Sequence, residues 1–100
     1  MTTFRHVVCF RWAEGTTGDE VARLREMLGG LPAAIPDVRR YDFGADVGVA
    51  DGNYDFAIIA DFDDRDGWLA YQEHPEHQPV LAYVRSLATD RVAVQLELDA

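Results

Sequence analysis

The stretch FRHVVCFRW (Phe4–Trp12) decides the fold, because it is apolar on both of its faces. Successive side chains of a strand point to opposite faces, and this stretch alternates in that way. One face carries Phe4, His6, Val8, Phe10 and Trp12. The other carries Val7 and Cys9 between Arg5 and Arg11. A strand of this kind needs a cover on each side, so the sheet around it must be buried on both faces.

The remaining elements follow from their own patterns. Leucines and valines at helical spacing from Val21 to Leu31 predict a first helix, which Pro36 prevents from continuing beyond Ile35. Apolar stretches then predict strands at Val38–Phe43 and Tyr54–Phe62, separated by a turn at Asp51-Gly52-Asn53. A second helix carries Trp68, Leu69 and Tyr71, a third helical piece begins at Pro75, and a last strand covers Val92–Leu98.

The order strand, helix, strand, strand, helix, strand is the split βαβ arrangement of ferredoxin-like α+β proteins. It predicts an antiparallel sheet with helices on one face. The second face, which holds Val7 and Cys9, is then best covered by the sheet of a second copy. We therefore expect a homodimer in which two sheets form one α/β barrel.

Composition limits the classes of partner. One hundred residues that are 48% hydrophobic suit a single domain over residues 1–100. The formal net charge is −9, and the acidic residues are spread along the chain. Such a surface repels phosphate backbones and anionic lipids, so neither nucleic acid nor a membrane is an expected partner.

Cysteine usage and the N-terminal residues indicate a compartment. Cys9 is the single cysteine, which excludes an internal disulfide and suits a reducing environment. The residues from Met1 to His6 lack the pattern of a signal peptide, and no apolar run is long enough to span a membrane. We expect a cytoplasmic protein.

The segment YQEHPEH (Tyr71–His77) is the candidate for chemistry, because it holds a phenol and two of the three histidines. Pro75 favours the first turn of a helix, which predicts His74 as a cap and places His77 on the first helical turn. Imidazole titrates near neutrality, so a buried one beside a phenol can transfer protons. A helix junction with structural histidines is the alternative.

Several short motifs, in this order and spacing, resemble the stress-responsive dimeric α/β-barrel (Dabb) family over essentially the whole chain. They are Arg5-His6-Val7-Val8, Leu31-Pro32 with Ile35-Pro36, Phe43-Gly44, Gly52-Asn53-Tyr54-Asp55, and Tyr71 followed by His74-Pro75-Glu76-His77. The resemblance implies the same ferredoxin-like protomer and dimeric barrel.

The resemblance also implies a site. A plant polyketide cyclase of the family uses a histidine as general base and a tyrosine that holds the developing oxyanion, which match His77 and Tyr71 here. A cavity-lining strand histidine matches His6. Two positions depart from that pattern, since Leu28 replaces a cavity tyrosine and Gln95 replaces the carboxylate that orients the base. The pocket is then expected to be lined by Val8, Phe10, Leu24, Leu28 and Gln95.

No cofactor is expected. His74 and His77 lack a third ligand at useful spacing for zinc or iron. Some family members hold a magnesium ion through backbone carbonyls after the first helix, and the resemblance places those carbonyls at Pro32, Ile35 and Val38.

Two classes of function follow from these residues. The first is a cofactor-independent enzyme of the polyketide-cyclase kind, which transfers protons on a small hydrophobic, phenolic or polyketide-like compound. The second is a non-catalytic stress-responsive or ligand-binding dimer. A cofactor-free monooxygenase of the related barrel superfamily has no distinguishing residue here.

Overall fold

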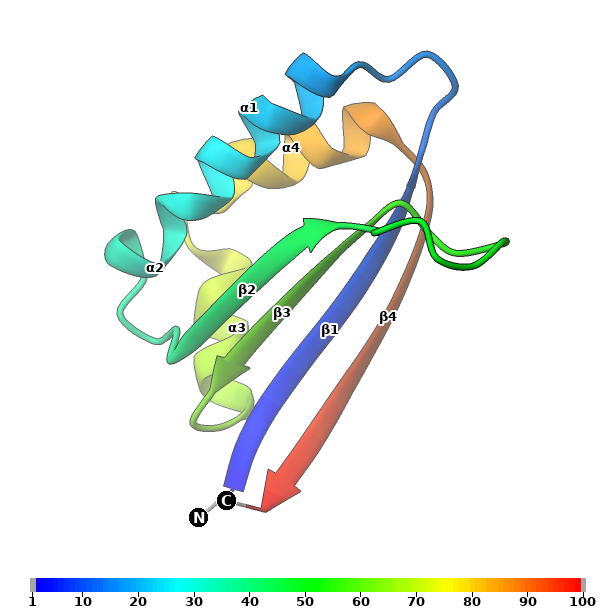
Figure 1. The fold of residues 1–100 in the computed structure, drawn as a ribbon. Coiled ribbons are helices and arrows are strands. Elements are labelled where there is room, and N and C mark those ends of the chain that lie inside the picture. Colours follow the sequence, from blue (N-terminus) through cyan, green and yellow to red (C-terminus); the bar gives the residue numbers. More distant parts are fainter. Residues whose placement is uncertain (1, 100) are drawn as a thin grey trace.

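The fold is built around strand β1 (Thr2–Trp12), which pairs with a strand on each side (Figure 1). The structure is a computed structural model, and it describes residues 2–99. The other elements are α1 (Gly18–Gly29), α2 (Leu31–Ala34), β2 (Arg40–Ala45), β3 (Phe56–Phe62), α3 (Arg65–Glu73), α4 (Gln78–Leu87) and β4 (Ala88–Asp99). All strand pairs are antiparallel, in the order β2-β3-β1-β4. The predicted ferredoxin-like α+β fold is therefore confirmed.

The helices lie on one face of the sheet, and the core fills the space between them (Figure 1). Val8 and Phe10 of β1 are buried there, as the alternation predicted. Leu24 and Leu28, four residues apart on α1, meet them from the helix layer and are almost fully buried. Burial of this shared apolar surface is what stabilises the helices on the sheet.

A capping residue marks the start of α1, and a proline marks the start of α4. The side chain of Thr17 accepts a hydrogen bond from the backbone N–H of Glu20, whose carboxylate accepts one from the Thr17 N–H. The third helical piece begins at Gln78 rather than at Pro75. Pro79 occupies its first turn, so the proline that starts this helix is the second of the two.

The segment before α4 is a turn, which corrects the expected positions of two histidines. His74 ends α3, and its Nδ1 accepts a hydrogen bond from the Glu76 N–H. The His77 N–H donates to the His74 carbonyl at 3.0 Å, and His77 is the residue just before α4. His77 therefore has helical backbone angles but precedes the first turn of the helix.

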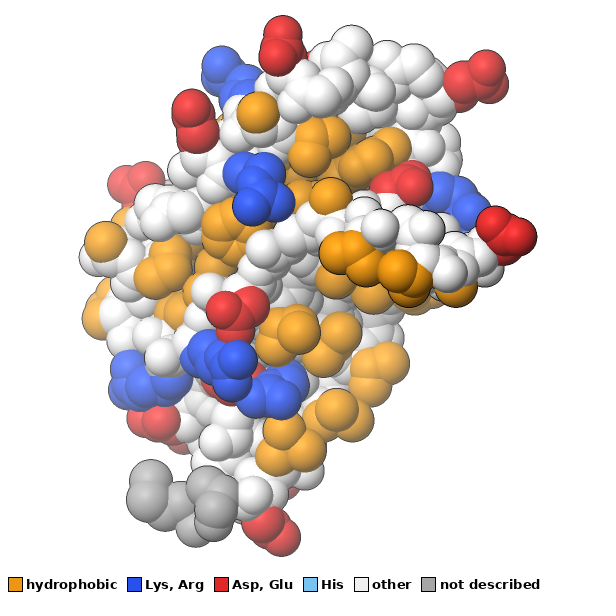
Figure 2. Space-filling model, viewed as in Figure 1, with side chains coloured by type: hydrophobic (Ala, Val, Ile, Leu, Met, Phe, Trp, Pro, Cys, Tyr) orange, Lys and Arg blue, Asp and Glu red, His pale blue; other side chains and the backbone are white. Residues whose placement is uncertain are grey.

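The opposite face of the sheet carries no helix, and it is largely apolar (Figures 1 and 2). On β4, Val92, Val94 and Leu96 are between 43% and 54% exposed. They pair with Cys9, Val7 and Arg5 of β1, so these side chains share the open face. We call this surface the open sheet face.

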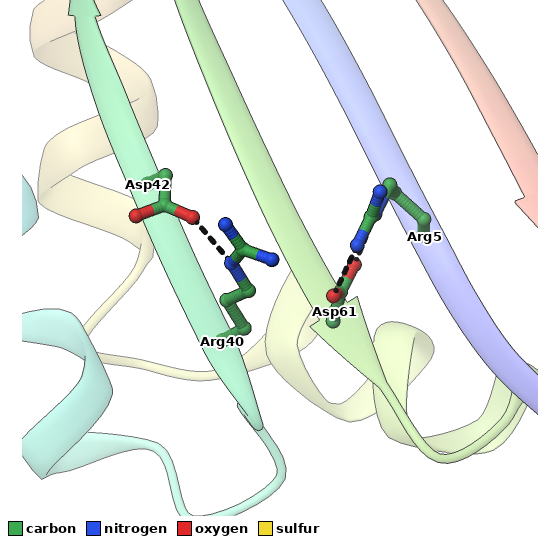
Figure 3. Close-up of polar contacts among 4 residues, drawn as sticks. All are labelled: Arg5, Arg40, Asp42 and Asp61. Carbon is green, nitrogen blue, oxygen red and sulfur yellow. Dashed lines mark hydrogen bonds and ion pairs between the residues drawn. The ribbon is translucent and has the colours of Figure 1, made fainter. Parts of the chain in front are cut away.

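A charged row crosses one end of the open sheet face (Figure 3). Arg5 donates two hydrogen bonds to the carboxylate of Asp61, at 2.7 and 2.9 Å, and Arg40 pairs with Asp42 on β2. Asp61 is only 6% exposed, and the hydrogen bonds from Arg5 hold the pKa of its carboxyl below the usual range. The two ion pairs hold alternating positive and negative side chains at this end of the open sheet face.

Candidate functional site

A cavity of about 290 Å³ lies between the inner face of the sheet and the helices. Its apolar wall consists of Val8, Phe10, Leu28, Ile58, Val80, Leu81 and Val84. Its polar groups belong to His6, Tyr71, Gln72, His77, Arg85 and Arg91. This volume is at the lower end of the range for small-molecule sites, and a mostly apolar wall with a few polar groups is their usual construction.

Three separate elements bring the predicted residues together. His6 is on the inner face of β1, Tyr71 is on α3, and His77 is the residue before α4. The short turn between α3 and α4 folds His77 back onto Tyr71, and their ring centroids lie 4.1 Å apart. His6, Tyr71 and His77 are all buried, and all three line the cavity.

His77 is the buried imidazole whose hydrogen bonds are incomplete. Its Nδ1 atom is buried and receives no hydrogen bond from any residue of the described chain. Burial lowers the pKa of His77, and the backbone of Gln72 and Tyr71 acts against this change. Neither backbone group is close and aligned enough to form a hydrogen bond of standard geometry with Nδ1. Burial therefore favours the neutral ring, which is the form that a general base requires.

Tyr71 is joined to a second phenol that the sequence did not single out. Its hydroxyl oxygen lies 2.8 Å from that of Tyr41 on β2. Burial raises the pKa of Tyr71 to about 12, and the hydrogen bond from Tyr41 acts against that rise. The pKa of Tyr41 is also raised by burial. When Tyr41 donates, the Tyr71 hydroxyl keeps its own proton for a ligand.

Gln95 meets His6 rather than His77. The Gln95 amide nitrogen lies 2.8 Å from Nδ1 of His6, because the two residues are directly opposite each other on β4 and β1. The expected link from residue 95 to His77 is therefore not found. An amide carries no charge, and burial, with smaller effects of Arg91 and His77, lowers the pKa of His6 to about 4.

Two of the expected pocket residues are not part of the cavity wall. Val8, Phe10 and Leu28 line the cavity, whereas Leu24 is fully buried in the core and Gln95 is exposed beside it. Leu24 and Leu28 are one helical turn apart, and only the residue nearer the end of α1 reaches the cavity. Helical spacing placed both on the inner face without separating them.

Arg85 and Arg91 are cavity residues that sequence reasoning missed. Arg91 is opposite Phe10 in the pairing of β4 with β1, so it shares the inner face with His6. Arg85 follows Leu81 by one turn of α4. Helical spacing from Leu81 indicated the position of Arg85. Strand alternation indicated a face for Arg91, but only the pairing register of β4 with β1 shows that this is the face of His6.

The region of the expected magnesium ligands is a short helix and the turn after it. Pro32 is in α2, and the Ile35 carbonyl accepts a hydrogen bond from the Val38 N–H at 3.2 Å. A carbonyl has a second lone pair, so this bond is compatible with a cation ligand, and the magnesium site stays a prediction. Within residues 2–99, no three His, Cys, Asp or Glu side chains are grouped closely enough to hold a metal ion.

No helix among the described residues combines the length and the apolar character that crossing a membrane requires.

Comparisons with known proteins agree with this architecture. A dimeric ferredoxin-like protein of unknown function from Thermobifida fusca is 49% identical, with a TM-score of 0.91 over 97% of this chain and 92% of that one. An uncharacterized protein of Streptomyces coelicolor is 36% identical over 87 residues, which are 85% of this chain and 90% of that protein.

A more distant neighbour shares the fold alone. The hydroxynitrile lyase of Passiflora edulis is 18% identical, with a TM-score of 0.84 over 97% of this chain and 96% of that one.

The family model described as the stress responsive A/B barrel domain (Dabb) matches residues 4–98. On this match over nearly the whole chain, the protein belongs to the Dabb family.

Proposed function

We propose that this chain is a homodimeric small-molecule enzyme that transfers protons without a cofactor, in the manner of a polyketide cyclase. The observation that carries the proposal is the buried imidazole of His77, which lies in the cavity wall against the ring of Tyr71 with its Nδ1 unpartnered among the described residues. A histidine whose only role is structural normally has its buried nitrogens hydrogen-bonded.

The chemistry assigns one role to each side chain. His77 takes a proton from a carbon between two carbonyl groups, which leaves an imidazolium and an enolate. Tyr71 donates a hydrogen bond from its hydroxyl group to the enolate oxygen and so stabilises the developing negative charge. In an aldol cyclisation the enolate carbon then attacks a second carbonyl of the same molecule, and the imidazolium returns its proton to the new alkoxide. His6 is a polar wall residue near His77.

The dimer belongs to the same proposal. The open sheet face exposes Val92, Val94 and Leu96 beside the partly buried Val7 and Cys9. A second copy covers these side chains and completes a barrel, as the relative from Thermobifida fusca is described to be dimeric. The unpaired Cys9 suits the cytoplasm in this arrangement.

Deuterium exchange of benzoylacetone tests the proton-transfer step. This uncharged compound has an acidic carbon between two carbonyls, and proton NMR in deuterated buffer follows the loss of its signal. We expect the protein to accelerate the exchange and His77→Gln to slow it by about 10²- to 10⁴-fold. Glu26→Gln is the control, because Glu26 is exposed on α1 and outside the cavity wall. Equal exchange with the wild type and with His77→Gln contradicts the proposal.

A non-catalytic ligand-binding dimer is the second candidate. The observation that favours it is that neither cavity histidine has a carboxylate partner within residues 2–99, since His6 meets the amide of Gln95. A base without such a partner gains less stabilisation of its protonated form. In this case benzoylacetone binds in the cavity and perturbs the Tyr71 and His77 resonances without faster exchange.

A further inference from the structure

The opening of the cavity is marked by two arginines. Among the residues that line the cavity, Arg85 on α4 and Arg91 on β4 are the exposed ones, whereas the histidines and Tyr71 are buried. The two guanidinium-bearing residues therefore belong to the solvent-exposed part of the cavity wall, where a ligand enters from water.

Neither arginine forms an ion pair with another residue of the described range 2–99. The ion pairs of the described residues use Arg5, Arg11, Arg39 and Arg40, and none of them involves Arg85 or Arg91. The residues that line the cavity include no Asp or Glu, and Arg91 acts on His6 and Arg85 on His77 as positive charges. In a chain of net charge −9, the cavity is thus a local positive site.

We propose that the cavity takes an amphipathic anion, whose apolar body fills the pocket and whose carboxylate is held at the opening by Arg85 and Arg91. The inference rests on the proposed function for the site itself and adds the class of substrate. A guanidinium binds a carboxylate through two parallel N–H donors, and two such groups select for the charged end of the ligand. The substrate is then a carbonyl compound that also carries a carboxylate.

The arrangement orients the ligand. The carboxylate stays with the exposed arginines because it is strongly hydrated, and the apolar portion leaves water for the wall of Phe10, Leu28 and Ile58. This places the middle of the molecule beside His77 and Tyr71, which line the same cavity. The two arginines attract an anion to the cavity, although the chain as a whole carries a net charge of −9.

Two isosteric probes test the proposal. Calorimetry compares 3-phenylpropanoate with the uncharged 3-phenylpropanamide on the wild type and on Arg85→Gln, Arg91→Gln and the double variant. We expect the carboxylate to bind at least about fivefold more tightly than the amide, and each single variant to weaken carboxylate binding by about two- to fivefold. Added salt should weaken carboxylate binding and leave amide binding unchanged.

Arg65→Gln is the control, since Arg65 is exposed on α3 and outside the cavity wall, and its loss should leave both affinities unchanged. Equal binding of the two probes, with no effect of the arginine variants, overturns the anion proposal and leaves the proposed function standing. Failure of both probes to bind overturns the anion proposal too. Benzoylacetone has no carboxylate, so its exchange reports on the proposed function independently.

Discussion

The hydroxyl oxygens of Tyr41 and Tyr71 lie 2.8 Å apart and connect strand β2 to helix α3. Tyr41 shares its strand face with Phe43, which packs near it in an edge-on arrangement. Tyr41 is thereby held in place, and in the arrangement where Tyr41 donates, Tyr71 keeps its own hydroxyl hydrogen for a ligand. Tyr41 acts as a positioning residue for the proposed oxyanion donor.

Removing the Tyr41 hydroxyl should weaken both stability and activity. We expect Tyr41→Phe to lower the free energy of unfolding by about 1 kcal/mol, because a partly buried hydrogen bond is lost. Exchange of benzoylacetone should also slow, since the Tyr71 hydroxyl is no longer oriented. Urea unfolding measures the first effect. Tyr54→Phe serves as the control, because the Tyr54 hydroxyl forms no hydrogen bond with the described residues. Unchanged values for Tyr41→Phe would refute this role.

Stability should fall as the pH falls from about 6.5 to about 4, because of His6. The pKa of His6 is about 4 in the folded chain and near 6.5 when unfolded, so the unfolded chain binds the proton first. The loss reaches about 3 kcal/mol at the lower end of this window. His77 adds to it with the same sign. Asp61 contributes in a different window, below its ordinary pKa of 3.8.

Urea titrations at pH 7 and pH 5 measure this effect. The variant His6→Gln should lose most of the difference between the two pH values, because glutamine does not titrate. If the variant shows the same pH dependence as the wild type, the burial of His6 does not explain it.

Placing a carboxylate at residue 95 should act on His6. Gln95→Glu brings a negative charge next to His6 Nδ1, which the amide now contacts at 2.8 Å. An opposite charge at this range raises the pKa of an imidazole by roughly one to three units. Histidine ring resonances followed against pH should show a large upward change in the pKa of His6 and a smaller one for His77. A larger change for His77 would mean that the pairing of Gln95 with His6 is wrong in solution.

A charge on the open sheet face should disrupt the proposed dimer. Val94 is 54% exposed in the single chain and lies opposite Val7 in the middle of that face. Val94→Glu would bury an unpaired carboxylate against a second copy, which should weaken dimerisation by at least about 100-fold. Sedimentation at micromolar concentration reads the change. Ala82→Glu, on an exposed position of α4, is expected to leave the dimer intact. A monomeric wild type would contradict the barrel proposal itself.

The sequence by itself determined the fold. Alternation from Phe4 to Trp12 established which β1 side chains enter the core, because the side-chain period of a strand is fixed by covalent geometry. The turn that brings the rings of Tyr71 and His77 to 4.1 Å was not predicted, because Pro75 was expected to begin a helix and α4 begins only at Gln78. Strand alternation can be read from the local sequence because it depends only on the geometry of neighbouring residues.

Only the tertiary structure decided which residues from distant segments meet. The Gln95 amide contacts His6, separated from it by 89 positions, and Tyr41 meets Tyr71 across the layers. Arg85 of α4 and Arg91 of β4 line one cavity, although they belong to the helix layer and to the sheet. The pairing register of β4 with β1 and the seating of α3 on the sheet fix these contacts, and both depend on packing of the whole core rather than on any local pattern.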